Sequence, residues 1–332
     1  MKLFVTGGAG FIGSHFIADA LIEGHTVVAV DNFSTSNLRT IERIKLTSSK
    51  DFVFHEIDIC DQDSLRSIVK NHSIDVVVHF AAFKSVPESI INPLKYYKNN
   101  LSGSIALFGV MREFKINNII FSSSASVYGS AHNSPIKENF PLDPISPYAH
   151  TKVIIESILR DMANSIKKFK ALNLRYFNPV GCHETHLLGE SPAMEPTNLF
   201  PVICSVAKGE KEFLSIFGED YDTHDGTPVR DYIHISDLVS GHLSALEWFK
   251  KDEKVLEINL GTGQGYSVLD IVNTFNSFLD KPIKFKFTPK RQGDPGSIYA
   301  DNSLAKVELN WNCSRSLLNM CEDSWHWYSK DF

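Results

Sequence analysis

The sequence contains no apolar run of the roughly 18 residues that a membrane-spanning helix needs. It also has no block of lysines and arginines, and its net charge is −6. Nucleic acid attracts proteins that carry a basic patch or stripe, which this chain lacks. Neither repeats nor low-complexity segments occur. We therefore expect no membrane partner and no nucleic-acid partner, and any site for a phosphate group must be local.

Cysteine is scarce, and the five residues are odd in number, scattered and without the spacing of a metal site: Cys60, Cys182, Cys204, Cys313 and Cys321. Free thiols are typical of a reducing compartment, so we expect a cytoplasmic protein with no bound metal. The chain begins at once with the strand-like MKLFVTG, and no signal peptide is expected.

The 332 residues suffice for a large core, arranged as two domains or as one domain with a lobe. Over the first half, β-rich runs alternate with helical stretches. Strands are expected at 2–7, 26–31, 51–58, 74–82, 118–124 and 170–178, and helices at 11–24, 63–72, 96–114 and 148–168. This order predicts an α/β protein with a Rossmann-type, doubly wound parallel sheet covered by helices on both faces.

The regularity fades after residue 178. Residues 179–197 are rich in Gly, Pro, Glu and His and are expected to form a loop, and a helix starts near Leu199. A buried strand at 255–263 is expected to return to the first domain. We therefore expect residues 1–178, with a returning strand near 255–261, to form the Rossmann domain. Residues 179–332 form mainly a smaller, sequence-interleaved α/β substrate lobe.

The stretch TGGAGFIG places Gly7, Gly10 and Gly13 between the first strand and the first helix. Glycines at this spacing let the backbone approach a pyrophosphate, and the helix N-terminus supplies free N–H donors. The second strand ends in Asp31, whose carboxylate suits the ribose hydroxyls of NAD and repels the 2′-phosphate of NADP. A structural glycine turn is the alternative, but the strand, loop, helix and acid together favour an NAD-binding domain.

Two later strand ends point to the same ligand, because open α/β sheets bind ligands at the carboxyl ends of their strands. Asp58 and Ile59 follow the third strand and are expected to bracket an adenine. FAAFKS (80–85) follows the fourth, and its small residues suit close approach of a cofactor. Lys84 in this stretch is either a cofactor contact or an ordinary surface lysine.

PYAHTK (147–152) places a phenol four residues before an amine, so Tyr148 and Lys152 share one helix face. Ten tyrosines make a chance pair a serious alternative. The context favours function: Ser146 can cap the helix, and SSSAS at the preceding strand end supplies hydroxyls. We expect the lysine and the helix N-terminus to lower the pKa of Tyr148, which suits it to take a proton from a sugar hydroxyl.

The glycine loop, serine strand end and Tyr-x-x-x-Lys, in this order, resemble the extended short-chain dehydrogenase/reductase family. Later segments narrow the resemblance to the UDP-glucose 4-epimerase (UDP-galactose 4-epimerase) family: LRYFNPVG (174–181), NLFP (198–201), FGEDYDTHDGTPVRDYIHISDL (217–238), GTGQGYSVLDIV (261–272) and RQGDPG (291–296). The match runs through nearly the whole chain. The DGTPVRDYIH segment is far more specific than the glycine loop.

The resemblance implies a role for each matching position. The catalytic residues are Ser124, Tyr148 and Lys152. The NAD contacts are Gly7, Gly10, Phe11, Ile12, Gly13, Asp31, Asn32, Asp58, Ile59, Phe80, Ala81, Lys84, Asn99, Ser122, Tyr148, Lys152 and Phe177. The UDP-sugar contacts are Ser124, Asn178, Asn198, Leu199, Phe217, Arg230, Tyr232, Arg291, Asp294 and Ile298. The chemistry agrees, since two arginines can hold a diphosphate through charge-assisted hydrogen bonds.

The activity implied is interconversion of UDP-galactose and UDP-glucose without net redox change. Tyr148 takes the 4′-hydroxyl proton as hydride leaves C4′ for NAD, and the hydride returns to the opposite face of the turned sugar. Alternatives remain: an epimerase of another UDP-sugar (UDP-N-acetylglucosamine/galactosamine or a UDP-uronate), a net dehydrogenase, or a regulatory protein that binds the nucleotide sugar without turnover. A 4,6-dehydratase is disfavoured, because SSSAS lacks that family's Thr-Asp-Glu.

Three further expectations follow. The helices at 96–114 and 153–168 carry apolar residues on more than one face, so we expect a homodimer. Ile298 falls where the family borders the sugar's 2′-substituent, and its intermediate size predicts a preference for plain hexoses. The loop CHETHLLGES (182–191) departs from the family. Its histidines and acids suggest a metal, but flexible loop residues are the preferred interpretation.

Overall fold

The computed structural model describes residues 1–130, 133–191, 198–291 and 294–330. At its centre, seven parallel strands pair in the order β11-β6-β5-β4-β1-β2-β3. The strands are β1 (Lys2–Thr6), β2 (Thr26–Asp31), β3 (Val53–Glu56), β4 (Val76–His79), β5 (Asn118–Ser124), β6 (Lys170–Tyr176) and β11 (Val255–Leu260). The predicted doubly wound parallel sheet is therefore confirmed.

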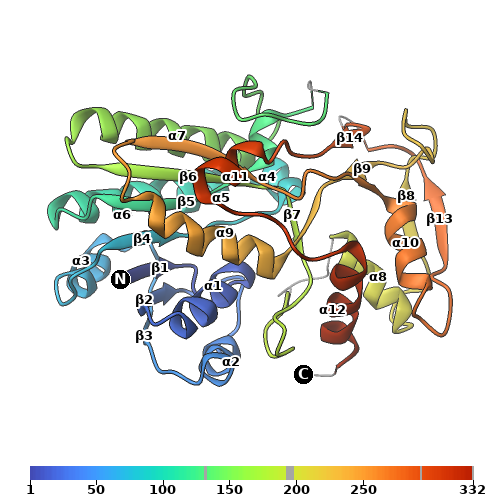
Figure 1. Cartoon of the computed structure of the whole chain (residues 1–332), viewed down its shortest axis with the longest axis horizontal. Coiled ribbons are helices and arrows are strands. Elements are labelled where there is room, and N and C mark those ends of the chain that lie inside the picture. The colour runs from blue at the N-terminus through green and yellow to red at the C-terminus, as the bar shows by residue number, and fades with distance from the viewer. Residues whose placement is uncertain (131–132, 192–197, 292–293, 331–332) are drawn as a thin grey trace.

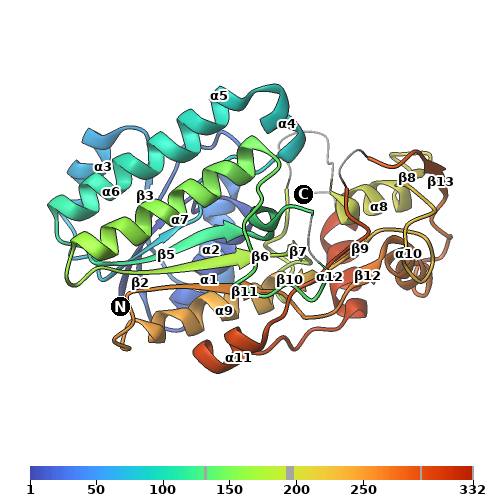
Figure 2. The ribbon, with the colours of Figure 1, turned by 90° about the horizontal axis from the view of Figure 1, so that it is seen from above.

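Helices cover both faces of the sheet (Figures 1 and 2). One face carries α1 (Phe11–Ile22), α2 (Arg39–Ser48), α9 (Ile235–Trp248) and α11 (Ser303–Leu309). The other carries α3 (Gln62–Val69), α6 (Gly103–Glu113) and α7 (Pro147–Ser165). Val76 and Val78 of β4 pack on the first face, whereas Val77 packs on the second. This burial on both sides explains the continuous apolar run that the sequence shows there.

The helix expected at 96–114 is present and contains a π-helical turn. The chain forms α4 (Val86–Ile91), α5 (Pro93–Tyr96) and a π-helical turn (Tyr97–Ser102) before α6 begins. Asn100 in this turn accepts a hydrogen bond from the Phe83 N–H (2.9 Å) and donates to the Phe83 carbonyl (3.0 Å). The widened turn thus fastens the loop after β4, and π-helical turns frequently occur at functional sites.

Most of residues 178–330 form the smaller lobe at the right of Figure 1. Its strands form short sheets: β7 (Asn178–Val180) with β10 (Tyr232–His234), β8 (Leu214–Phe217) with β13 (Phe285–Thr288), and β9 (Val229–Arg230) between β12 (Tyr266–Ser267) and β14 (Ser297–Ile298). Its helices are α8 (Leu199–Ala207), α10 (Val268–Asn276) and α12 (Leu317–Ser329), whose apolar faces share one core.

The two parts are interleaved in sequence. β11 lies far beyond residue 178 and yet pairs with β6 at the edge of the large sheet. The expected loop 179–197 begins inside β7, and residues 192–197 lie outside the described residues. Within the described part of the chain, no helix combines the length and the apolar character that crossing a bilayer requires.

Candidate active site

The carboxyl ends of six parallel strands meet at one edge of the large sheet, β1 to β6. The sheet order places β4 and β2 on opposite sides of β1, and the helices that follow β1 and β4 pack on opposite faces. Such a reversal of strand order is where open α/β sheets bind their ligands. The residues expected to contact a cofactor follow these strand ends.

The loop after β1 is shaped by close backbone contacts. A Cβ at Gly7, whose φ is +70°, would lie 2.7 Å from the Ala81 nitrogen, and one at Gly13 would lie 2.2 Å from the Gly7 oxygen. The first turn of α1 contains no acidic side chain, and its N-cap, Gly10, makes no side-chain cap bond. The helix therefore presents uncapped N–H groups beside a compact glycine cradle, and this arrangement fits a pyrophosphate.

Asp31 ends β2 beside this loop. Its carboxylate accepts hydrogen bonds from the Ala9 N–H (3.0 Å), the Phe33 N–H (2.9 Å) and the Ser36 hydroxyl (2.8 Å). A carboxylate offers about four acceptor positions, so one remains for a ribose hydroxyl. The sequence predicted only the ribose contact. The carboxylate also joins the glycine loop to the turn after β2, a role that no local pattern announces.

The other residues expected to contact the cofactor near the strand ends each contact a neighbouring side chain. The Asn32 amide donates to Asp58 (3.0 Å), which joins the turns after β2 and β3. Phe80, directly after β4, packs against the rings of Phe16 and His242. Asn99, in the π-helical turn, donates to the neighbouring Asn100 side chain.

Lys84, an expected cofactor contact, forms an ion pair with Glu190 (2.8 Å). Glu190 also accepts from the amide of Asn198, an expected sugar contact (3.2 Å). One carboxylate of the loop 182–191 therefore links the two halves of the site, and sequence reasoning did not assign it a role.

The proposed proton-transfer residues come together. Ser124 ends β5, and Tyr148 occupies the first turn of α7, where Ser146 caps the helix through the Ala149 N–H (3.2 Å). The Ser124 hydroxyl lies close enough to Tyr148 to influence the acidity of its phenol. Lys152 lies one turn further on, almost fully buried, and donates to the Ser122 carbonyl (2.7 Å). The strand end and the helix therefore hold one phenol, one hydroxyl and one amine in a single group.

Burial, rather than the neighbouring cation, dominates the acidity of Tyr148. Burial raises the pKa of this phenol, and the nearby Ser124 hydroxyl opposes the rise. Burial also lowers the pKa of Lys152 to about 7, while the charge of Glu156 raises it. The expectation of a lowered tyrosine pKa is therefore wrong for the protein without ligands. The lysine amine donates to the Ser122 carbonyl, and its nitrogen lies 5.7 Å from the centre of the Tyr148 ring.

Beneath this group lies a buried ion pair that the sequence analysis missed. Arg175 of β6 donates to both oxygens of Glu156 on α7 (3.0 and 2.7 Å), and Glu156 also accepts from the Ser123 hydroxyl (2.5 Å). The other side of Arg175 donates to the Tyr128 hydroxyl (2.8 Å). Two sequence signals were available: Glu156 lies four residues after Lys152, and Arg175 interrupts an apolar strand.

The expected nucleotide contacts lie on the short strands of the lobe. Arg230 forms an ion pair with Asp294 and donates to its neighbour's carbonyl, that of Val229 (2.7 Å). The Asp294 N–H donates to the Arg291 carbonyl (3.2 Å), and the Arg291 guanidinium stacks 3.9 Å above the Phe217 ring centre. Arg230 of β9 is therefore linked through Asp294 to the loop that carries Arg291.

The remaining sugar contacts surround this group. The Asn178 amide donates to the Asp231 carbonyl (2.8 Å), and Ile298 pairs with Arg230 across β14 and β9. Phe177 belongs to the small apolar cluster against which Ile298 packs. Tyr232 is buried against Phe200 beside the start of α8 at Leu199, and burial raises its pKa to about 12.

Comparisons with known proteins agree with this geometry. A family model described as GDP-mannose 4,6 dehydratase matches residues 4–324. The UDP-glucose 4-epimerase of Bacillus subtilis (strain 168) is 44% identical over 331 residues, which cover 100% of this chain and 98% of that protein.

Two solved structures are also similar. The UDP-glucose 4-epimerase of Stenotrophomonas maltophila, with bound NAD and formylated UDP-arabinopyranose, has a TM-score of 0.97 at 42% identity and covers 99% and 98% of the two chains. The enzyme of Bifidobacterium longum, in complex with NAD+ and UDP, has a TM-score of 0.95 at 40% identity with the same coverage.

Proposed function

The chain belongs to the UDP-glucose 4-epimerase family, and from this premise we propose that it interconverts UDP-galactose and UDP-glucose with NAD as its cofactor. One observation carries the proposal. Ser124, Tyr148 and the buried Lys152 meet at the carboxyl edge of a sheet whose glycine cradle fits a dinucleotide.

In this proposal the NAD-binding Rossmann domain comprises residues 1–178, with the returning strand near 255–261, and residues 179–332 mainly bind the UDP-sugar. The uncapped N-terminus of α1 and the glycine loop hold the pyrophosphate of the cofactor. Asp31 accepts from the adenosine ribose through its remaining acceptor position, and Lys84 and Lys152 contact the cofactor further along. When bound there, NAD would supply the hydride acceptor and donor for C4′ of the sugar.

The protein's own part is proton transfer and orientation. The Tyr148 oxygen takes the proton of the 4′-hydroxyl and later returns it, while the Ser124 hydroxyl orients the same substrate oxygen. Burial makes the free phenol a weak acid, so phenolate must be stabilised by charge brought close to it. Lys152 supplies this charge when it is protonated, and the buried Glu156 favours that protonated form.

Epimerisation also requires a sugar that can turn over. Arg230 and Arg291 are positioned to hold the diphosphate, with Asp294 beside them as an acceptor for ribose hydroxyls. The sugar itself would meet mainly Ser124, Asn178 and Ile298. A firmly held nucleotide and a loosely held hexose allow both faces of C4′ to reach the same hydride site.

The matching family model is described as a GDP-mannose 4,6 dehydratase, and the residues that end β5 argue against that activity here. Water elimination needs an acid–base pair beside the tyrosine, which the dehydratases supply as Thr-Asp-Glu. Here the corresponding residues are Ser124, Ala125 and Ser126, and the Ser126 hydroxyl donates to Ser124 (2.9 Å). This serine pair offers no carboxylate at the strand end, so we favour epimerisation.

The direct test is turnover by the purified protein. UDP-galactose should be converted to UDP-glucose without added NAD, because the same cofactor molecule serves both half-reactions and should copurify. Parallel assays with UDP-N-acetylgalactosamine and a UDP-uronate test the alternative substrates. Accumulation of NADH during turnover would indicate a net dehydrogenase, and nucleotide binding with no product would indicate a regulatory protein.

We further propose a cytoplasmic homodimer. The five cysteines are all free thiols, which fits a reducing compartment. Helices α6 and α7 lie side by side on the outside of the sheet (Figure 2). Ile155 and Leu159 of α7 face the core, while Val153, Ile154 and Ile158 on its other sides remain half-exposed. Sedimentation at micromolar concentration should give a dimer, and a monomer would reject this assembly.

A further inference from the structure

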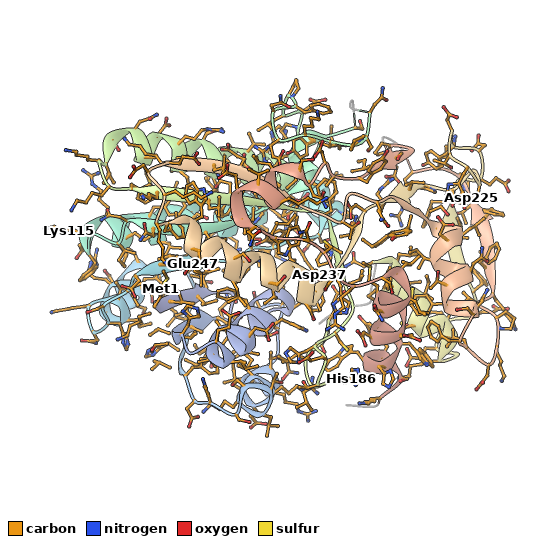
Figure 3. All side chains as sticks on the ribbon, in the orientation of Figure 1. Met1, Lys115, His186, Asp225, Asp237 and Glu247 are labelled. Atoms are coloured by element: carbon orange, nitrogen blue, oxygen red, sulfur yellow. The ribbon has the colours of Figure 1, made fainter. Side chains whose placement is uncertain are left out.

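Three potential metal ligands meet where the loop 182–191 packs against the C-terminal helix α12. They are the thiol of Cys182, the imidazole of His186 and the carboxylate of Asp323, and their ligand atoms all lie within 4.8 Å of one another. His186 projects from the loop beside this helix (Figure 3). The cluster lies outside the proposed active site and has no role in the proposed reaction.

The donor set and its spacing match a zinc-class cation. Sulfur, nitrogen and oxygen ligands of these three types are those that zinc takes in proteins. His186 Nε2 and Asp323 Oδ1 are 3.5 Å apart. Two ligands that each lie about 2.0 Å from a tetrahedral ion are separated by roughly 3.3 Å. These two atoms therefore already have the required spacing, and the sulfur lies within 4.8 Å of both.

Neighbouring groups hold the carboxylate in the right orientation. His234 Nδ1 accepts a hydrogen bond from the Ser236 N–H (3.1 Å), so the imidazole proton is on Nε2. This Nε2–H donates to Asp323 Oδ2 (3.1 Å) and leaves Oδ1 directed at His186. Such outer hydrogen bonds to ligating carboxylates are typical of metal sites.

The imidazole of His186 is held as well. Its ring stacks on His326 of α12 with ring centres 4.4 Å apart and planes 10° from parallel. His186 also has a φ of +56°, in the left-handed region that residues other than glycine adopt uncommonly. The His186 N–H bonds to the His183 carbonyl (2.7 Å), and Cys182 and Gly189 form a β-bridge that closes the loop.

We propose that Cys182, His186 and Asp323 bind one divalent cation of the zinc class. A water molecule takes the fourth position, which the partial exposure of His186 leaves accessible. Binding releases the thiol proton and forms a sulfur–metal bond with no redox change. The ion ties the loop to α12, and this loop also carries Glu190, which contacts Lys84 and Asn198. The sequence alone had favoured a loop without metal, because Asp323 is remote in the chain.

Cobalt(II) is the probe that reports the sulfur bond directly. We expect the purified full-length protein, with its nucleotide bound, to take up about one cobalt per chain. A thiolate-to-cobalt charge-transfer band and tetrahedral visible bands should appear, and zinc should displace both. Cys182→Ala should abolish the charge-transfer band. Cys313→Ala, which alters a thiol packed against the core of the large sheet, should leave it intact.

His186→Gly tests the same site while relieving the strained backbone, so the variant should fold. Its cobalt affinity should fall at least tenfold, and zinc should no longer raise its thermal unfolding temperature as it does in the parent. Absence of a charge-transfer band at micromolar cobalt, or a band that survives Cys182→Ala, would overturn the proposal. Unchanged affinity in His186→Gly would overturn it as well. These readouts do not require turnover, so they are independent of the proposed reaction.

Discussion

The two ends of the candidate active site are built differently. The chemical end stands on the large parallel sheet and on α7, a helix of 19 residues. The nucleotide end stands on a three-stranded sheet whose strands are two residues long, together with the loops beside it. Proton transfer needs positions held to within a fraction of an ångström, whereas a diphosphate anchor tolerates adjustment. The fold places its most regular elements where the geometry is most demanding.

The charges at the two ends also differ in their environment. Glu156 and Arg175 are almost completely excluded from water, as is Lys152. The side chains of Arg230 and Asp294 are 17% and 27% exposed. Water screens the second pair, so its mutual attraction is modest, and Arg230 can exchange partners when a diphosphate arrives. We therefore expect substitutions at the chemical end to reduce rate or stability and substitutions at the nucleotide end to weaken binding.

The largest effect should come from removing one oxygen at the chemical end. Tyr148→Phe keeps the ring and its packing but removes the titrating group. General acid–base catalysis contributes about 10²–10⁴-fold, so kcat should fall by at least this factor. Binding of UDP-sugar and NAD should change little. A rate within a few-fold of the parent, with folding confirmed by circular dichroism, would mean that the Tyr-x-x-x-Lys spacing is accidental.

The second-largest effect should come from breaking the buried Glu156–Arg175 ion pair. Glu156→Gln leaves Arg175 without its charged partner in the core, and breaking such a pair costs about 3–5 kcal/mol of unfolding free energy. Chemical denaturation measures this loss. Arg160→Met is the matched control, because the Arg160–Glu257 pair bridges the same helix and sheet at the surface. It should cost about 1 kcal/mol or less. Equal losses of unfolding free energy in the two variants would mean that the buried pair stabilises the fold no more than the surface pair.

Arg230→Met should separate binding from chemistry. Hydrogen bonds to charged groups contribute about 1.5–3 kcal/mol, which corresponds to roughly 10- to 150-fold in affinity for UDP. KM for the UDP-sugar should therefore rise while kcat stays within a few-fold. Arg315→Met, which alters a surface pair with Glu184, should change neither. A loss confined to kcat would place Arg230 at the chemical end instead.

The pH dependence of stability should reveal the buried amine. The pKa of Lys152 is lowered from 10.5 to about 7, so the unfolded chain holds this proton at pH values where the folded protein has released it. Below pH 7, burial of the protonated Lys152 amine lowers the free energy of unfolding by its full amount. This loss disappears as the pH rises toward 10.5. Nucleotide-free parent protein should therefore gain stability over this range relative to Lys152→Met, by at most about 1.4 kcal/mol per pH unit. Urea denaturation at several pH values measures the unfolding free energy of both proteins. If the parent and Lys152→Met depend on pH in the same way, the amine titrates normally.

The smallest effect concerns sugar preference. Ile298 lies next to Arg230 on paired strands, where a larger ring would restrict the space for a 2′-substituent. The parent should prefer UDP-glucose and UDP-galactose and show weak N-acetyl activity at most. Ile298→Tyr should abolish that weak activity and change hexose turnover only a few-fold. Comparable efficiency of the parent on both sugar pairs would contradict this assignment.

The large sheet was predictable because its signals are local. The strand expected at 26–31 has the same bounds as β2, and the strand at 118–124 has those of β5. The continuous apolar run of β4 is likewise typical of a strand that is buried on both faces. The helix expected at 96–114 is present, but its π-helical turn was not predicted, and Asn100 in that turn bonds to the loop at Phe83. That partner lies too far away in sequence to influence any local pattern.

The sequence by itself determined the cofactor loop, the Tyr148–Lys152 pair and the alternation of strands and helices. In each case the responsible residues lie within one turn, one strand or one helix. Tertiary structure alone decided the acidity of the phenol and amine, the Glu156–Arg175 pair beneath them and the meeting of Cys182, His186 and Asp323. The physical reason is that desolvation and ion pairing depend on which surfaces pack together. Residues remote in the sequence come into contact only when the sheet and lobe have assembled.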